Sequence, residues 1–212
     1  MFTIQSFCFN PFQENTYLLY NENKEAIIID PGMYNAYEQK EFSDFISSNQ
    51  LTPQFLLNTH CHIDHVLGNK YCMEKYNLPL QIHKADLSTL QNANVAATIY
   101  SIPYDKSPEP SIFLTENDSI TLGLDILSIL YTPGHSSGSI SFYCEDQNFI
   151  ISGDVLFEQS IGRTDLPGGD FQTLINSIKT QLMTFPDITQ VHSGHGNVTS
   201  IGNERQFNPY LT

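Results

Sequence analysis

N-T-H-C-H-I-D-H, residues 58–65, follows directly on a short apolar run and places three histidines and one aspartate within six residues. In an extended chain the side chains at i and i+2 share a face, so His60 and His62 can bind one metal ion together. A turn after them directs Asp64 and His65 toward a neighbouring position. The stretch therefore predicts two adjacent metal positions, and a polar or pH-sensitive loop is the alternative.

Three later motifs end an apolar run with glycine and a metal-binding side chain. They are T-P-G-H ending at His135, S-G-D ending at Asp154, and S-G-H-G around His195. Glycine lets the backbone turn sharply and keeps side-chain bulk away from an ion. Four ligands cannot complete two metal sites, so these motifs are predicted to supply the remaining ones.

The sequence resembles the metallo-β-lactamase-fold hydrolases, and within them the glyoxalase II-like (hydroxyacylglutathione hydrolase-like) proteins. The resemblance covers nearly the whole chain and includes G-R-T-D-L-P-G-G at residues 162–169 besides the motifs above. It implies an α/β fold, a four-layer αβ/βα sandwich with metals at one edge of the sheets. It also implies His60, His62 and His135 at one metal site, Asp64, His65 and His195 at a second, and Asp154 as the bridge between them.

Length and composition are compatible with this resemblance. The chain has 212 residues, of which 40% are apolar, which is enough for one substantial core. The predicted ligands extend from residue 60 to residue 195, so residues 1–212 are expected to form a single domain. The first residues lack the charged and apolar regions of a signal peptide, and no apolar run approaches the length that spans a bilayer. A cytoplasmic protein without a membrane partner is expected.

Charge and cysteine content exclude other classes. The formal net charge is −14, which disfavours binding to a nucleic acid backbone and hence a nuclease or phosphodiesterase function. The four cysteines are widely spaced and form no C-x-x-C pair, so neither a disulfide framework nor a structural zinc ribbon is indicated. Cys61 lies beside the ligands and is expected to pack rather than to bind metal.

Apolar periodicity and turn signals predict strands interleaved with helices. Helices are expected around residues 42–46, over 66–76 directly after the ligand stretch, and over 171–185. Residues 91–110 contain three prolines and no clear period, so a surface loop bordering the cleft is expected there. Strands are predicted at residues 3–9, 16–20, 26–30, 55–57, 80–82, 119–122, 125–130, 139–143, 149–152 and 189–192.

The ligand types indicate the chemistry. Imidazole and carboxylate without thiolate suit zinc, and equally iron or manganese. Two divalent ions roughly 3.5–4 Å apart can share one water, lower its pKa and hold the hydroxide as a nucleophile. Asp154 would bind both ions, and Asp64 can orient the attacking hydroxide. We therefore expect a dinuclear metal-dependent hydrolase that cleaves a thioester or a related small acyl substrate.

Arg163 is the candidate for substrate recognition, because it follows the Asp154 loop and is one of nine basic residues. A structural ion pair with Asp165 or Asp170 is the alternative, and Asp170 is also expected to cap the helix that follows it. Aromatic side chains are expected to line the cleft, namely Tyr100, Tyr104 and Phe157. His83 and His192 are expected outside the ligand set.

Two further functions fit the same motifs. A mononuclear iron persulfide dioxygenase belongs to a branch of the superfamily that shares H-x-H-x-D-H and G-R-T-D, and a non-catalytic metal-binding interaction module is the third reading. Full-length glyoxalase II enzymes carry a C-terminal helical domain that contacts glutathione. The tail at residues 197–212 is too short for such a domain, so tight binding of a glutathione moiety is not expected. The sequence leaves the oligomeric state open.

Overall fold

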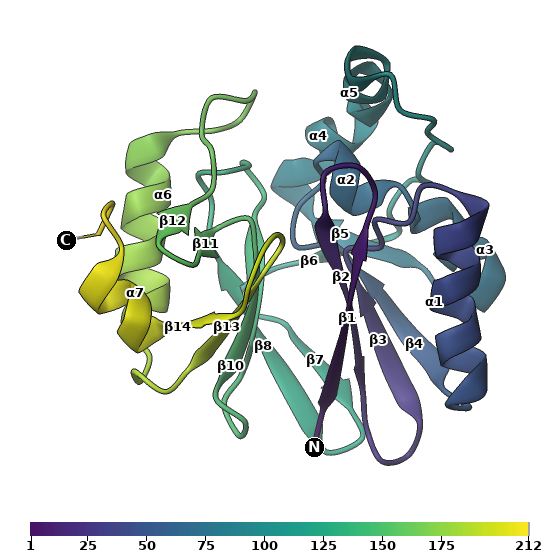
Figure 1. The fold of residues 1–212 in the computed structure, drawn as a ribbon, viewed down its shortest axis with the longest axis horizontal. Coiled ribbons are helices and arrows are strands. Elements are labelled where there is room, and N and C mark those ends of the chain that lie inside the picture. Colours follow the sequence, from purple (N-terminus) through teal and green to yellow (C-terminus); the bar gives the residue numbers. More distant parts are fainter. Residues whose placement is uncertain (212) are drawn as a thin grey trace.

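The structure, a computed structural model, describes residues 1–211 and contains two six-stranded sheets (Figure 1). The first sheet has the order β1 (Thr3–Phe9), β2 (Glu14–Tyr20), β3 (Glu25–Ile29), β4 (Thr52–Leu57), β5 (Leu80–His83) and β6 (Ile112–Leu114). The second has the order β14 (Thr199–Ser200), β13 (Gln190–Ser193), β10 (Phe149–Gly153), β9 (Ile140–Cys144), β8 (Asp125–Tyr131) and β7 (Ser119–Leu122). A short hairpin, β11 (Leu156–Phe157) and β12 (Ser160–Ile161), stands beside them.

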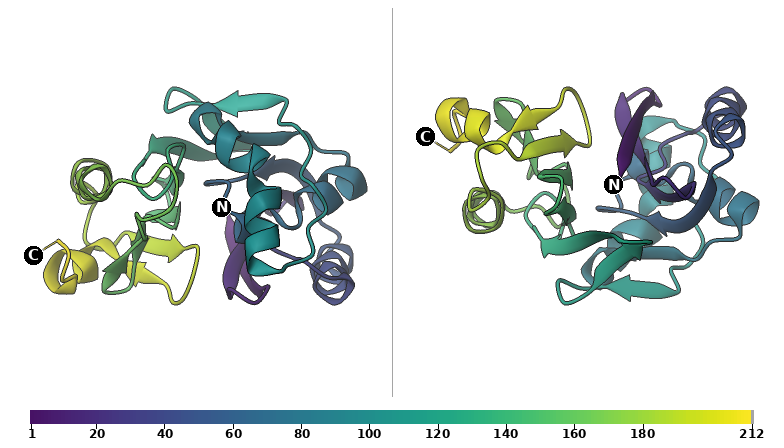
Figure 2. Two further views of the ribbon diagram at one scale, coloured as in Figure 1. Left: turned by 90° about the horizontal axis from the view of Figure 1, so that it is seen from above. Right: turned by 90° about the horizontal axis from the view of Figure 1, so that it is seen from below.

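Helices cover the outer face of each sheet. The first sheet carries α1 (Ala36–Ser48), α2 (Ile63–Val66), α3 (Asn69–Tyr76), η1 (Lys84–Asp86), α4 (Leu87–Gln91) and α5 (Ala93–Tyr100). The second carries α6 (Phe171–Ser177), the π-type turn η2 (Ile178–Leu182) and α7 (Ile201–Phe207). Viewed from above and below, the two sheets face each other between the two helical layers (Figure 2). This is the four-layer αβ/βα sandwich that the sequence predicted.

Strand periodicity explains how one sheet contributes to two layers of core. Ile28 of β3 packs among the residues of α1 and α3, whereas Ile27 and Ile29 pack against the second sheet. All three are fully buried. Successive side chains of a strand point to opposite faces, so a strand covered on both faces must be continuously apolar.

Parallel pairing brings the ligand-bearing loops to one edge. The strands β3, β4, β5 and β6 run parallel, and in the second sheet β10 runs parallel to β13. The carboxyl ends of parallel strands meet at the same edge of a sheet. The loops after β4, β8, β10 and β13 therefore converge at this edge.

Two predicted segments differ from the structure, and one segment without a predicted element forms a helix. Residues 91–110 were predicted as a surface loop, but residues 93–100 form α5, whose Ala93 and Ala97 are buried in the core one turn apart. The helix predicted over 66–76 is interrupted because the Gly68 amide donates to the Pro31 carbonyl at 2.7 Å. The tail adds α7, which the sequence did not indicate.

Asp170 caps α6 as predicted, since its side chain accepts the Thr173 amide at 2.7 Å.

None of the helices in the described part of the chain is long and apolar enough to cross a membrane.

Candidate metal centre

Six of the predicted ligands form two groups of three at the common edge of the sheets. In each group, one ligand atom from every residue lies within 4.8 Å of those of the other two. The first group is His60, His62 and His135, and the second is Asp64, His65 and His195. These are the two sets that the family resemblance implied.

Asp154 lies between the two groups. Its Oδ2 is 3.5 Å from His135 Nε2 in the first group and 3.5 Å from His195 Nε2 in the second. Its Oδ1 is 3.4 Å from His65 Nε2. One carboxylate thus faces both groups, which is the position that a bridging ligand requires.

The structure places glycine where a side chain would close this space. A Cβ added to Gly194 would overlap Asp154 Oδ1 and lie 2.7 Å from Cε1 of His65. A Cβ added to Gly153, whose φ is +53°, would overlap Thr59. The strand ends therefore approach each other closely because these two residues lack side chains.

Backbone carbonyls fix the orientation of two imidazoles. His135 Nδ1 donates to the Arg163 carbonyl at 2.7 Å, which leaves Nε2 facing the centre. His195 Nδ1 donates to the carbonyl of Phe12 at 3.0 Å, so its Nε2 also faces inward. A histidine whose outer nitrogen donates to an acceptor has its tautomer and ring plane set for metal binding.

The buried Asp30 carboxylate fixes the orientation of two further imidazoles, those of His65 and His60. His65 Nδ1 donates to Asp30 Oδ2 at 3.1 Å, and the Thr59 hydroxyl donates to the same oxygen at 2.6 Å. The Thr59 hydroxyl oxygen lies 3.1 Å from His60 Nδ1 and accepts a hydrogen bond from it, because the hydroxyl hydrogen is directed to Asp30. One carboxylate therefore sets an imidazole in each group.

Burial keeps the first group in the form that binds metal. Burial holds the pKa of His60 well below its usual value. Burial and the neighbouring His135 lower the pKa of His62 to about 4. At neutral pH both rings carry a free lone pair, as a metal ligand must.

The second group attracts positive charge. Burial alone would lower the pKa of His65, but Asp64 and Asp154 outweigh it and raise that pKa well above its usual value. Burial likewise opposes ionisation of Asp154, yet the charge on His65 lowers its pKa well below the usual range. The carboxylates thus favour a cation in the space that they share.

Unsatisfied atoms and spacing both fit divalent ions here. His65 Nε2 and Asp154 Oδ1 are buried without a hydrogen-bond partner among residues 1–211, a condition that buried polar atoms rarely tolerate. Atoms bound to one tetrahedral ion at about 2.0–2.1 Å lie about 3.3 Å apart. The His60 and His135 Nε2 atoms are 3.2 Å apart, and His195 Nε2 is 3.1 Å from Asp64 Oδ2.

The sequence interpretation missed a buried carboxylate, Asp86, that joins two ligand loops. Its Oδ2 accepts the Cys61 amide at 2.5 Å, between His60 and His62. Its Oδ1 accepts the Gly138 amide at 3.0 Å and the Ser136 hydroxyl, next to His135. No motif marks Asp86, because its partners are distant in sequence.

Two other carboxylates were missed as site residues. Asp30 carried a signal, since it ends a continuously apolar strand immediately before Pro31 and yet is buried. Glu14 is fully buried with Oε1 at 3.9 Å from His65 Nδ1, and burial raises its pKa well above the usual value. The Thr16 hydroxyl donates to Glu14 Oε2 at 2.9 Å.

Residues expected outside the ligand set belong to neither ligand group. The buried ring of His192 packs edge-on against Tyr17 and Phe149, and His83 lies over Tyr131 with ring centroids 4.6 Å apart. Cys61 is buried, and burial raises the pKa of its thiol well above its usual value.

Arg163 lines the cavity above the ligands and also forms the ion pair that was its alternative role. Its Nε and one terminal nitrogen donate to the two oxygens of Asp165, both at 2.7 Å. The side chain remains 55% exposed. Tyr100 and Phe157 line the cavity as expected, whereas the Tyr104 hydroxyl accepts the Ser107 amide and its ring packs with the first core.

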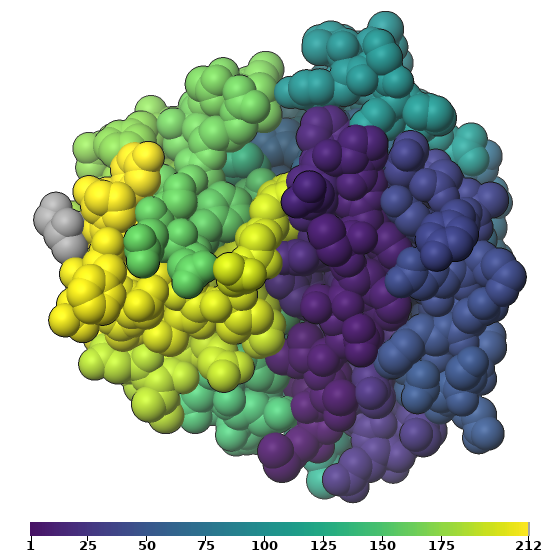
Figure 3. Space-filling model, in the orientation of Figure 1, coloured from purple at the N-terminus to yellow at the C-terminus, as the bar shows by residue number. Residues whose placement is uncertain are grey.

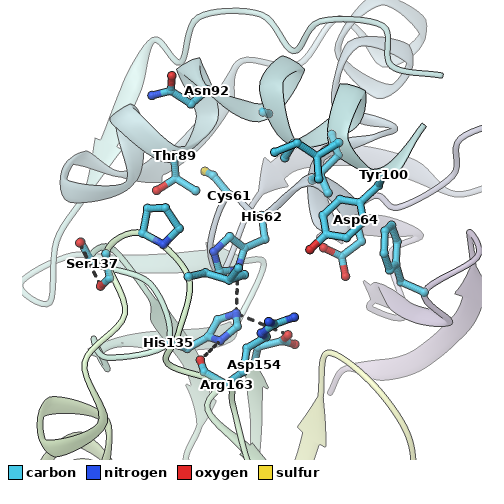
Figure 4. A pocket seen from close by; sticks show the side chains of 18 of the residues that line it. Cys61, His62, Asp64, Thr89, Asn92, Tyr100, His135, Ser137, Asp154 and Arg163 are labelled. Carbon is cyan, nitrogen blue, oxygen red and sulfur yellow. Dashed lines mark hydrogen bonds and ion pairs between the residues drawn. The ribbon is translucent and has the colours of Figure 1, made fainter. Parts of the chain in front are cut away.

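The cavity has a volume of about 1000 Å³, and its lining includes His62, Asp64, His135, Asp154 and His195 of the candidate ligands. Figure 4 shows His62, His135 and Asp154 together, with Arg163 beside them, and Asp64 next to Tyr100. In the space-filling view a hollow separates the teal segment around α5 from the green segment before α6 (Figure 3). The two halves of the chain therefore enclose the site between them.

The sandwich and its paired ligand groups define a metal-dependent hydrolase of the metallo-β-lactamase type. The family model for the metallo-beta-lactamase superfamily matches residues 9–195, and the chain belongs to this superfamily. Proteins with this fold bind divalent metals, in agreement with the donor set found here.

Two curated relatives extend over nearly the whole chain. The probable metallo-hydrolase YqgX of Bacillus subtilis is 38% identical over 202 residues, which are 95% of this chain and 93% of YqgX. The hydroxyacylglutathione hydrolase GloC of Haemophilus influenzae is 34% identical over 203 residues, which are 94% of this chain and 93% of GloC.

Solved structures show the same similarity. The BLEG-1 B3 metallo-beta-lactamase is 37% identical with a TM-score of 0.91 and covers 99% of this chain and 100% of its own. TTHA1623, solved in a di-iron-bound form, is 35% identical with a TM-score of 0.88. The similarity covers 98% of this chain and 100% of the TTHA1623 chain. ETHE1 from Myxococcus xanthus is 25% identical with a TM-score of 0.79. The similarity covers 98% of this chain and 83% of the ETHE1 chain.

Proposed function

We propose that this protein hydrolyses a thioester at a pair of divalent ions. The observation that carries the proposal is the presence of two groups of three candidate ligands, with Asp154 between them, and members of both groups line one cavity. The similarity to GloC, a hydroxyacylglutathione hydrolase, supports a thioester as the substrate.

Seven side chains would hold the ions. His60, His62 and His135 would hold one ion, Asp64, His65 and His195 the other, and Asp154 would bind both. Zinc is the proposed metal, with iron and manganese as alternatives that suit the same donors. When bound, the ions would supply Lewis acidity toward the substrate carbonyl and lower the pKa of a water molecule between them.

The chain's own residues orient the attacking water and the metal-binding imidazoles. Asp64 Oδ2 lies beside His195 and faces the shared space, where it can accept a hydrogen bond from the attacking water and orient it. Asp30 and the Arg163 carbonyl keep the imidazoles in the required tautomers. A thiolate leaving group needs little protonation, so cleavage of a thioester does not depend on a general acid.

Arg163 is the proposed anchor for an anionic group of the substrate. It lines the cavity and its guanidinium is half exposed, so it can exchange part of its contact with Asp165 for a ligand carboxylate or phosphate.

Metal analysis of protein purified without added metal, combined with a substrate panel, tests the proposal. We expect about two divalent ions per chain and hydrolysis of S-lactoylglutathione or simpler thioesters. The Asp154→Ala variant should lose this activity, and His83→Ala is the matched control because His83 lies outside the ligand groups. Full metal loading without turnover of any thioester would contradict the proposal.

A mononuclear iron persulfide dioxygenase is the second candidate. The likeness to ETHE1 is compatible with it as well as with the hydrolase. The complete second ligand group, Asp64, His65 and His195, favours the hydrolase, because a mononuclear enzyme does not need it. One iron per chain together with oxygen consumption on glutathione persulfide would establish the dioxygenase instead.

A further inference from the structure

The turn between β1 and β2 lies against the loop that carries His195. We call residues 10–15, which comprise this turn and the first residues of β2, the hairpin end. The Asn15 amide donates to the Gly194 carbonyl at 2.7 Å, and Glu14 and His195 form an isolated antiparallel bridge. In Figure 3 the yellow segment that follows β13 abuts the purple hairpin. The hairpin end of the first sheet is thus paired with a ligand loop of the second.

The side chain of Asn15 holds both sides of the His195 loop. Its Nδ2 donates to the Ser193 carbonyl and to the Gly196 carbonyl, both at 3.0 Å. His195 Nδ1 in turn donates to two backbone carbonyls of the hairpin end, at 3.0 and 3.2 Å. One stretch of the chain therefore fixes the backbone on either side of His195 and the imidazole itself.

The hairpin end also reaches the two ligands of the second group that follow β4. Asn10 Nδ2 donates to the backbone carbonyl of Asp64 at 3.0 Å, and the fully buried Glu14 carboxylate lies 3.9 Å from His65 Nδ1. Among residues 1–211, no hydrogen bond or ion pair joins the hairpin end to a ligand of the first group. Of the two ligand groups, its polar contacts reach only the second.

The hairpin end is itself held in one conformation, so it can fix the segments that it contacts. Asn10 and Gln13 have φ values of 53° and 57°, and the Gln13 amide donates to the Asn10 carbonyl at 3.1 Å. The Asn10 side chain accepts the Phe12 amide at 3.0 Å, a local turn that asparagine forms readily. Its Nδ2 also donates to the Gly32 carbonyl at 3.0 Å. None of these contacts involves a candidate metal ligand.

We propose that the hairpin end is the positioning element of the second metal site and that Asn15 is its principal positioning residue. The inference rests on the pair of ions in the proposed function and goes beyond it by assigning a separate support to each ion. His195 comes from the second sheet, whereas Asp64 and His65 come from the first. The hairpin end contacts both sides and sets their separation, as Asp86 does for the first group.

Loss of the Asn15 side chain should weaken the binding of one ion and spare the other. Asn15→Ala removes both hydrogen bonds to the His195 loop and leaves every candidate ligand in place. Residues that orient a metal ligand typically contribute about 10–100-fold to metal affinity. We expect this loss for the ion at the second group and a change below about twofold for the ion at the first.

Competition with a chromophoric chelator measures the dissociation constant of each Zn²⁺ ion in the parent protein and in Asn15→Ala. One constant should rise by about 10–100-fold. Asn21→Ala is the matched control, because Asn21 also joins the two sheets from a turn, through its Nδ2 and the Leu122 carbonyl at 3.3 Å. Asn21 lies at the opposite end of β2 from Asn15, so both constants should be unchanged in this control.

A background that lacks the second group assigns the weakened ion. Asp64→Ala and His195→Ala together remove two ligands of that group and leave the first group intact. Adding Asn15→Ala to this background should not change the affinity of the remaining ion, because substitutions that act on the same site are not additive. A loss of about tenfold or more there would show that Asn15 supports the whole centre, and would overturn the proposal. Two unchanged constants in Asn15→Ala alone would also overturn it.

Asn15→Ser provides a second test should Asn15→Ala fail to fold, which circular dichroism reports. The serine hydroxyl can donate to one of the two carbonyls, so part of the affinity should be lost, and only at the second group. Equal weakening of both ions in this variant would contradict the proposal.

Metal affinity separates this inference from the proposed function, because it is measured without substrate. The selective loss in Asn15→Ala, without turnover of any thioester, would retain the role of Asn15 and refute the hydrolysis. Thioester turnover with two ions that bind equally tightly in the parent protein and in Asn15→Ala would support the hydrolysis and overturn the role of Asn15.

Discussion

The Asp86 carboxylate accepts the backbone N–H of Gly138 at 3.0 Å, and a Cβ added to Gly138 would lie only 2.6 Å from the Cβ of Asp86. The absence of a side chain at residue 138 thus permits the contact. The other carboxylate oxygen holds Cys61, so a single side chain links the loop of the first sheet to the His135 loop of the second. The distance between ligands from different sheets depends on this link.

Removal of the Asp86 carboxylate should weaken the first metal site. We expect Asp86→Ala to lower metal affinity or activity by about 10–100-fold, because the loops around His62 and His135 lose their common acceptor. Asp86→Asn should be milder, since its amide retains one acceptor oxygen. Competition with a chelator measures the affinity, and the exposed Asp105→Ala serves as the control. Equal affinities in all variants would contradict this role.

Loss of the Asp154 carboxylate should reduce metal content and activity more than any substitution outside the two ligand groups. Asp154 faces His135, His65 and His195 at 3.4–3.5 Å, so Asp154→Ala should reduce the metal content below two ions and activity by more than 100-fold. His83→Ala and Cys61→Ala should retain both. Steady-state rates measure the activity, and elemental analysis of the same preparations measures the metal content. A uniform loss of activity and metal across the three variants would place the site elsewhere.

Arg163→Ala should raise KM for thioesters with an anionic thiol moiety by roughly two- to fivefold, as expected for a solvent-exposed ion pair. Metal content should not change, because the Arg163 group that holds His135 is the backbone carbonyl. Asp165→Asn should lower KM, since it releases the guanidinium from its present partner. A fall in metal content in Arg163→Ala would show instead that the side chain supports the site.

The stability of the protein should decrease as the pH is lowered, because His192 is buried in its neutral form. Burial lowers the pKa of His192 from 6.5 to about 4. The unfolded chain therefore binds more protons than the folded one between these values, so the stabilisation is complete above pH 6.5 and is lost as the pH falls toward 4.

Between pH 7.5 and pH 5 the parent protein should lose about 2 kcal/mol more than His192→Gln, whose amide does not titrate. Urea unfolding of both proteins at both pH values measures the difference, and the metal ligands contribute equally to each. Parallel losses in the two proteins would contradict the assignment to His192.

The sequence predicted most of the fold because its strands are continuously apolar or alternate, and because each ligand follows such a strand. The wrong prediction at residues 93–100 has a physical cause. The helix buries only two small residues, Ala93 and Ala97, whereas its larger apolar residues Val95 and Ile99 are exposed toward the cavity, so its apolar side chains do not form one stripe that faces the core. The single-domain organisation and the individual metal-binding roles stay predictions that metal analysis and the variants above address.

The sequence alone determined the fold family and the seven candidate ligands, since its motifs next to the predicted strands resemble those of the metallo-β-lactamase-fold hydrolases. Only the tertiary structure decided which buried carboxylates support them. Asp30 contacts His65, which is 35 residues away in the chain, and Asp86 accepts the amide of Cys61, which is 25 residues away. Such contacts arise from the packing of the two sheets, and local sequence patterns do not encode the distance between segments that meet only in the folded chain.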